Sequence, residues 1–142
     1  MNREIKFRGL RIDGKGWVYG GVFMLYEYKQ AFIIESKHGY VGNTEVFPET
    51  VSQFTGLKDK NRIDIYEGDI VMREAVNRRA SGGGIYTIKW NNKKHSFALW
   101  YQYNENYGSF ATSSHSVPYT IIPKNIEITG NIHVNKGLIN TK

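Results

Sequence analysis

The segment QFTGLKDKNRIDIYEGDIV, which runs from Gln53 to Val71, is the most informative part of this chain. It begins with a charged stretch rich in turn-forming residues and ends in the β-branched pair Ile70-Val71. Gly56 and Gly68 tolerate positive φ angles, and Asp69 can accept backbone N–H groups where a strand starts. The segment therefore predicts a tight turn that is followed directly by a strand.

Further runs typical of β-strands lie on both sides of this segment. They are rich in β-branched and aromatic residues, and turn-forming residues separate them. The predicted strands are Ile5–Ile12, Trp17–Leu25, Ala31–Ser36, Ile70–Arg73, Ile85–Trp90, Ser96–Tyr103, Tyr119–Ile122 and Ile126–Val134. Short strands with frequent turns predict a mainly β fold, built as a small barrel or a sandwich.

Local features between the strands predict their connections. Asp13–Gly16 is typical of a hairpin turn, and the pair Gly20-Gly21 indicates a bulge or a close approach of two backbones. Pro48–Phe54 is expected to form one or two helical turns, because Pro and an acidic residue suit the start of a helix. The loop through Gly82–Gly84 is expected to be mobile.

Length and composition predict one intracellular domain that covers residues 1–142. A chain of 142 residues buries roughly two-thirds of its surface on folding. The absence of cysteine excludes disulfides and thiolate metal sites. The N-terminus has no apolar leader segment, and no run approaches the ~20 apolar residues of a membrane span. We therefore expect a cytoplasmic protein with no membrane partner.

Chemically active side chains are present, but their spacing does not match a catalytic or metal site. Glu67 and Asp69 can be interpreted as an acid–base or metal-binding pair, whereas a turn around Gly68 explains the same residues. The four histidines are scattered without ligand spacing. Lys58–Asn61 can be interpreted as a contact with a phosphate or a protein partner, or as a solvated turn. We expect no catalytic residue, no metal and no cofactor.

The formal net charge of +6 is concentrated in residues 73–94, which hold six of the basic residues and one acid. These residues form a candidate nucleic-acid contact, because Trp90, Trp100 and Tyr101 can stack on bases beside them. The alternative, which strand alternation favours, is that both tryptophans belong to the core and the lysines solubilise a hairpin tip. The candidate contact residues are Arg73, Arg78, Arg79, Lys89, Lys93 and Lys94.

The aromatic content favours self-association. Ten Tyr and three Trp exceed what the core of such a small domain easily buries, and aromatic residues are enriched at protein interfaces. Apolar surface left on a small β domain usually binds a partner or a second copy. We therefore expect a homo-oligomer.

The segment Gln53–Val71 also resembles the central segment of the YopX-like phage protein family. The resemblance extends to Ile5–Arg8 with Trp17–Gly20, to Pro48–Val51 and to Ile126–Ile132. The structural signature residues that it places in the middle of the chain are Gly56, Tyr66, Glu67, Gly68 and Asp69.

Two positions depart from the family pattern. Arg62 stands where the family usually has Gly, and Thr129 stands where it usually has an apolar residue. Both departures concern a turn or packing. The resemblance implies a bacteriophage or prophage protein that contains an SH3-like β-barrel and self-associates. It also implies a variable region at about residues 73–117, and it implies no particular biochemical activity.

These observations predict a non-enzymatic accessory protein of the host-cell cytosol. It is expected to act through self-association and through contacts with a host or phage protein. The alternative is a nucleic-acid-binding accessory that uses the basic hairpin of residues 73–94.

Overall fold

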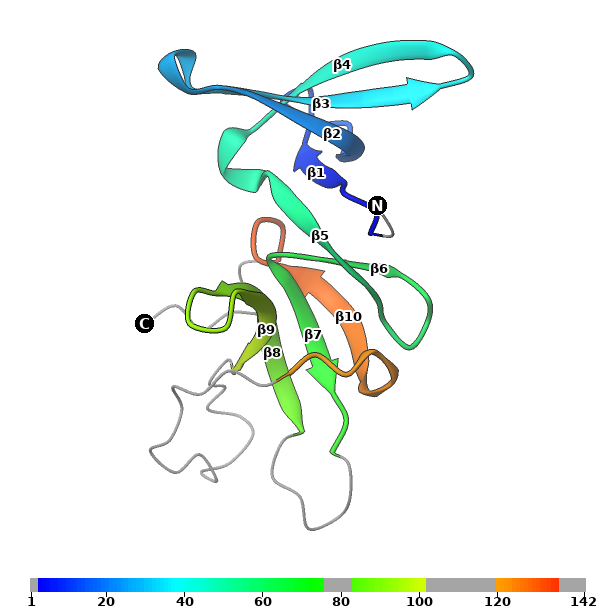
Figure 1. Cartoon of the computed structure of the whole chain (residues 1–142), viewed down its shortest axis with the longest axis vertical. Helices are drawn as coiled ribbons and strands as arrows, with labels where there is room; N and C mark the ends of the chain where they lie inside the picture. Colours follow the sequence, from blue (N-terminus) through cyan, green and yellow to red (C-terminus); the bar gives the residue numbers. More distant parts are fainter. Residues whose placement is uncertain (1–2, 76–82, 102–119, 136–142) are drawn as a thin grey trace. The chain divides into compact units, whose positions relative to one another are not determined.

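The structure is a computed structural model that describes residues 3–75, 83–101 and 120–135. The predicted mainly β fold is confirmed, with short 3₁₀ helices at Tyr26–Tyr28 (η1), Pro48–Thr50 (η2) and Pro123–Asn125 (η4). The strands (Figure 1) are β1 Phe7–Leu10, β2 Trp17–Leu25, β3 Gln30–Lys37, β4 Tyr40–Val46, β5 Ser52–Lys58, β6 Asp64–Tyr66, β7 Asp69–Arg73, β8 Gly84–Asn91, β9 Ser96–Tyr101 and β10 Ile126–Asn131. Among the described residues, no helix is long and apolar enough to span a membrane.

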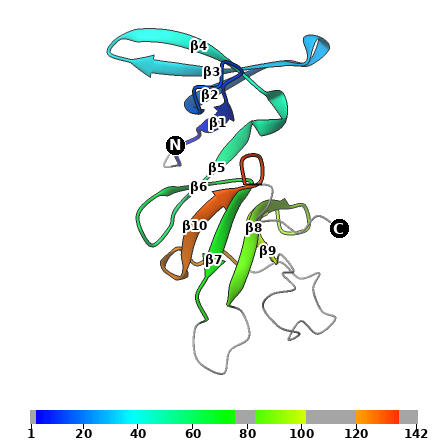
Figure 2. The ribbon, with the colours of Figure 1, turned by 180° about the vertical axis from the view of Figure 1, so that it is seen from behind.

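The strands form two antiparallel sheets, with the orders β4-β3-β2-β1-β5-β6 and β10-β7-β8-β9. The chain divides into two compact units, Met1–Gly56 and Leu57–Lys142. Both views of the ribbon show β2, β3 and β4 side by side in the first unit, and β10, β7 and β8 side by side in the second (Figure 2). Neither sheet closes into a barrel within the described ranges, so the predicted SH3-like barrel is not confirmed.

The first unit folds around one face of its sheet. The buried residues of this core are Val18, Ala31, Ile33 and Val46. The sheet curls around them because the end of β1 bonds to the end of β4. Ile12 N donates to Glu45 O (3.3 Å), and Phe47 N donates to Leu10 O (2.9 Å). The inner face is filled by the core, and the outer face of β2, β3 and β4 points away from it.

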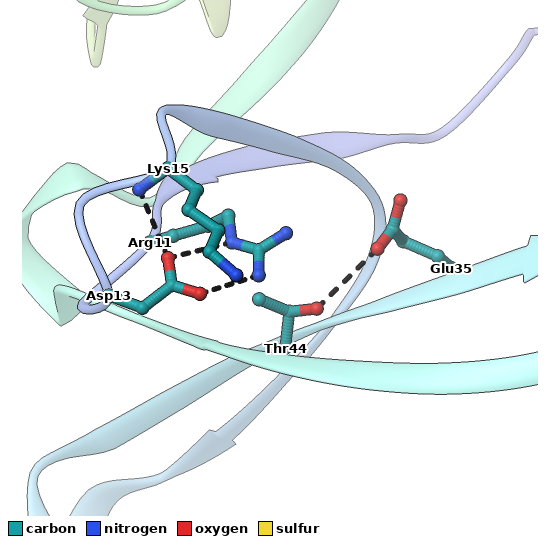
Figure 3. A network of polar contacts seen from close by, with 5 residues as sticks. All are labelled: Arg11, Asp13, Lys15, Glu35 and Thr44. Carbon is teal, nitrogen blue, oxygen red and sulfur yellow. Dashed lines mark hydrogen bonds and ion pairs between the residues drawn. The ribbon is translucent and has the colours of Figure 1, made fainter.

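An ion pair closes the turn between β1 and β2 (Figure 3). Arg11 donates to Asp13 through Nε (2.9 Å) and Nη2 (2.6 Å), and the N–H of Lys15 donates to Asp13 Oδ1 (3.1 Å). The hydrogen bonds from the Arg11 side chain and then from the Lys15 N–H lower the pKa of Asp13 to about 2. Gly14 and Gly16 have positive φ, so the predicted turn is confirmed.

The second unit has its own core and one bulge. Its buried core residues are Ile65, Val71, Tyr86, Ile88, Leu99, Ile121 and Ile126. The pairing of β10 with β7 shifts register between Ile128 and Gly130, which makes Thr129 the extra residue of a bulge. The Thr129 hydroxyl donates to Ile70 O (3.3 Å). A polar residue therefore suits this position, and the strand predicted for Ile126–Val134 ends at Asn131.

Several predicted boundaries are corrected by the tertiary pairing. Residues Tyr40–Val46 form β4, although no strand was predicted there. The helix predicted over Pro48–Phe54 is limited to η2, because Ser52–Lys58 forms β5, which pairs with β1. No strand forms at residues 120–122. Of the loop expected to be mobile, Gly82 lies outside the described residues, whereas Gly84 is the first residue of β8 and pairs with Arg73.

Candidate functional site

The central segment Gln53–Val71 contains two strands and two turns before β7 begins. Its first part belongs to β5, so the interpretation of this part as a turn-rich loop is wrong. The predicted role of the glycines is confirmed, because Gly56 has a φ of 85° and Gly68 a φ of 80°. The turns lie at residues 59–63, between β5 and β6, and at Glu67-Gly68, between β6 and β7.

Asp59 organises the first turn as a buried hydrogen-bond acceptor. Its Oδ1 accepts the N–H of Asn61 (2.8 Å) and of Ile63 (2.9 Å), and its Oδ2 accepts the N–H of Ile128 (3.1 Å) in β10. Asp59 is only 4% exposed. The carboxylate therefore joins the turn to a strand that lies far away in the sequence. These bonds favour a structural role over phosphate binding.

Asp69 has a similar role in the second turn. It is buried, its Oδ2 accepts the N–H of Tyr66 (2.8 Å), and its Oδ1 accepts Asn131 Nδ2 (3.4 Å). Gly68 donates its N–H to Ile88 O (2.8 Å). The predicted structural function of Asp69 at the start of the strand is confirmed. Across residues 3–75, 83–101 and 120–135, no group of three or more His, Asp or Glu side chains is arranged to hold a metal ion.

Lys58, the last residue of β5, and Lys60, in the first turn, both form ion pairs with acidic side chains. Lys58 pairs with Asp64, and Lys60 Nζ lies 2.6 Å from Glu127 Oε2 and 2.7 Å from Glu74 Oε1. The hydrogen bonds to Glu127 and then to Glu74 raise the pKa of Lys60 above its ordinary value. Because these cations are already paired, the turn is a poor site for a phosphate group.

The first turn also shows why the family usually has Gly at the position of Arg62. Arg62 has a φ of 66°, in the left-handed region that favours glycine, and its N–H donates to Asp59 O (2.9 Å). We expect Arg62→Gly to raise the free energy of unfolding by about 0.5–1 kcal/mol, measured by urea denaturation, because it removes backbone strain. Arg62→Ala keeps the strain and is the control. A gain for Arg62→Ala as large as that for Arg62→Gly would contradict this explanation.

The basic hairpin is described in part. At its turn Asn91 Oδ1 accepts the N–H groups of Lys93 (3.0 Å) and Lys94 (3.4 Å). Lys89, Lys93 and Lys94 are exposed, and residues 83–101 contain no acid. Trp90 is 41% exposed and packs edge-on against Phe97, with ring centroids 5.1 Å apart. The turn thus combines positive charge with an accessible aromatic ring.

The arginines among the candidate nucleic-acid contact residues are not placed at this hairpin tip. Arg73 lies opposite Gly84 at the start of β8, which places it roughly 20 Å along the strand from the tip. Arg78 and Arg79 lie outside the described residues. The assignment of Trp90 to the core is wrong, because Trp90 lies next to the turn of the hairpin and is 41% exposed. Trp100 and Tyr101 are half-buried.

An apolar patch lies on the outer face of β2, β3 and β4, beside the polar residues Ser36, Asn43 and Glu45 of the same face. Residues opposite each other on antiparallel strands share a face, and Phe23 opposes Phe32 while Ile34 opposes Gly21. The members of this outer patch are Tyr19, Phe23, Phe32, Ile34 and Val41. Three of them are strongly exposed: Tyr19 at 49%, Phe23 at 52% and Val41 at 74%. A solvated sheet face normally carries polar residues, so this patch is a candidate interaction surface.

Sequence reasoning missed the outer patch because β4 was not predicted. One signal was available in Trp17–Leu25, where both faces of the strand are apolar. A strand that covers a core on one side needs only one apolar face.

A family model described as YopX protein matches residues 6–140. The chain belongs to the YopX family. This YopX match extends through both compact units. Among the curated proteins compared, none matches the chain.

The fold of this YopX-family chain is similar to a solved structure, protein EF1440 from Enterococcus faecalis. The two share 24% sequence identity with a TM-score of 0.53, and the similarity covers 98% of this chain and 100% of the other. At this level of identity the likeness concerns the fold alone.

Proposed function

We propose that this YopX-family chain is a non-enzymatic accessory protein of phage or prophage origin. It acts in the host cytosol by binding copies of itself and other proteins. The observation that carries this proposal is the outer patch of β2, β3 and β4, where aromatic and branched side chains remain exposed. Burial of such a patch releases roughly 25 cal/mol for each Å² of apolar surface. A second copy of the chain is the partner that we propose for it.

Two finer structural proposals accompany this function. Residues 1–142 form a single YopX-like domain, which the family match across both units supports. An SH3-like barrel in the domain is supported by the short antiparallel strands β7–β10 around one apolar core.

Self-association predicts one defined oligomer at micromolar concentration, measured by size-exclusion chromatography with light scattering. Phe23→Lys is expected to lower the oligomer mass, because it replaces a strongly exposed aromatic side chain of the outer patch by a charge. Ile63→Lys is the matched control, since Ile63 is 54% exposed but lies in the turn between β5 and β6. A wild-type protein that stays monomeric throughout this range would contradict the proposal.

The second candidate function is binding of single-stranded nucleic acid at the hairpin tip. The observation in its favour is the exposed ring of Trp90 beside Lys93 and Lys94, without a neighbouring acid in residues 83–101. Stacking on an aromatic ring with phosphate contacts to lysines is the usual chemistry of such sites.

Fluorescence anisotropy with labelled single-stranded oligonucleotides tests this candidate. Affinity is expected to fall steeply between ~50 and ~200 mM salt. Replacing Lys93 and Lys94 together by Ala should weaken binding and lower the salt slope by about 1 for each phosphate group that the variant no longer binds. Lys124→Ala, at an exposed position away from the hairpin, is the control. Absence of binding at low salt would rule this candidate out.

A further inference from the structure

The outer edge of β4 is an open hydrogen-bonding edge. Strand β4 is the terminal strand of its sheet, so its partner on one side is β3 and no strand lies on the other within the described residues. Near its end, Glu45 O accepts the N–H of Ile12 on the side opposite to β3. Backbone groups alternate in direction along a strand, so those of Val41 and Asn43 also point away from β3. These groups are available to another strand.

This edge lacks the devices that normally prevent strand pairing. Natural edge strands are protected by charged residues, by Pro or by bulges. Residues Tyr40–Thr44 contain no charge and no Pro, and the register of β3 with β4 is continuous from Lys37 to Ala31. The first four residues of β4 are exposed.

We propose that two copies of this chain pair antiparallel through β4, around a two-fold axis at Gly42. This register places Val41 of each copy opposite Asn43 of the other, so that each of these residues can donate its N–H and offer its C=O across the axis. Gly42 then lies opposite Gly42 of the other copy in a non-hydrogen-bonded pair, the type in which the two Cα atoms are closer together. The absence of a side chain favours this close approach of the two strands. The pairing spans Tyr40–Thr44 and ends at Glu45, whose backbone oxygen is already bonded to the N–H of Ile12.

Charge does not oppose this register. The antiparallel arrangement brings Glu45 of one copy towards the turn of the other copy that follows Lys37, whose Nζ already lies 2.9 Å from Glu35 Oε1 of its own copy. No like charges face each other along the pairing. A two-fold interface of this kind is self-complementary.

This inference rests on the proposed self-association but adds a contact separate from the outer patch. Pairing at the β4 edge joins two sheets side by side and leaves the outer patch exposed on both copies. The two contacts are therefore independent. Phe23→Lys should remove the patch contact and leave β4 pairing intact, so this variant is expected to be a dimer.

The β4 contact is tested with variants whose monomers should fold normally. Asn43→Pro removes an outward N–H, which Pro tolerates at a strand edge; Asn43→Ala keeps it and is the control. A side chain at Gly42 meets no atom within 4 Å in the monomer, but Gly42→Lys places two like charges opposite each other in the pair. In the Phe23→Lys background, Asn43→Pro and Gly42→Lys should each weaken dimerisation at least about tenfold.

A mixing experiment tests whether the two-fold axis lies at Gly42. Gly42→Lys and Gly42→Glu copies, each weakened alone, should form a mixed dimer when combined in light scattering at low salt. A Phe23→Lys protein that is monomeric while the wild type is oligomeric would overturn β4 pairing and leave the proposed function standing. Conversely, wild-type and Phe23→Lys proteins that are equal dimers, both dissociated by Gly42→Lys, would support β4 pairing and overturn the role of the outer patch. A monomeric wild type would overturn both.

Discussion

Gly20→Ala is expected to lower the free energy of unfolding by at least about 3 kcal/mol, or to prevent folding of the first unit. A Cβ at Gly20 would lie 2.0 Å from the backbone oxygen of Ile34 and 2.9 Å from its carbonyl carbon. Backbone atoms in a paired strand cannot move aside as a flexible side chain can, so β2 and β3 would have to separate. The close backbone approach predicted for Gly20-Gly21 is thus confirmed at Gly20.

Gly21→Ala provides a matched control at the neighbouring position. The nearest atom to a Cβ there is Ile34 Cβ at 3.8 Å, an ordinary van der Waals distance. We expect this variant to remain within about 0.5 kcal/mol of wild type or to be more stable, because Ala loses less backbone entropy on folding than Gly. Urea denaturation followed by tryptophan fluorescence measures both variants. Equal stability of the two would show that the approach at Gly20 does not constrain the fold.

Asp59→Ala is expected to lower the free energy of unfolding by about 3–5 kcal/mol. The substitution leaves the N–H groups of Asn61, Ile63 and Ile128 without their acceptor, and each unsatisfied buried group costs about 1–3 kcal/mol. Asp59→Asn should be intermediate, at about 1–3 kcal/mol, since its amide oxygen replaces one carboxylate oxygen while its NH₂ faces a donor. Thermal and urea denaturation measure this ranking.

Asp64→Ala is the control for Asp59. Asp64 is the partner of Lys58 in a surface ion pair, and such pairs contribute about 0–1 kcal/mol. A loss of stability at Asp59 no larger than that at Asp64 would mean that the carboxylate does not hold the turn to β10. If Asp59→Asn folded with wild-type stability but lost a binding activity, Asp59 would belong to a functional site instead.

Parts of the candidate site could be predicted from short-range pattern. The sequence predicts a hairpin tip that carries lysines, and in the structure Asn91 Oδ1 accepts the N–H groups of Lys93 and Lys94 at this tip. The exposure of Trp90 was not predictable, because alternation assigns a strand face but does not show where the core ends along the strand. The separation of Arg73 from the tip follows from its pairing with Gly84, which charge clustering in the sequence does not reveal.

Features that depend on near neighbours in the chain could be predicted from the sequence. These are the mainly β class, the strand Trp17–Leu25, the positive φ angles of Gly56 and Gly68, and the bonding of Asp69 at the start of β7. Each follows from conformational preferences and hydrogen bonds within a few residues. The same local pattern carried the resemblance to the YopX family.

Which distant segments meet could not be predicted locally and follows from the tertiary structure. It made Ser52–Lys58 a strand by pairing β5 with β1, and it directed the Asp59 carboxylate to Ile128. It also gathered Tyr19, Phe23 and Val41 on one exposed face and left β4 at the edge of its sheet. Sheet pairing joins residues that are far apart in the chain, and local preference is too weak to specify those partners. For that reason Gln53–Val71 indicated the family, whereas the candidate surfaces emerged from strand order.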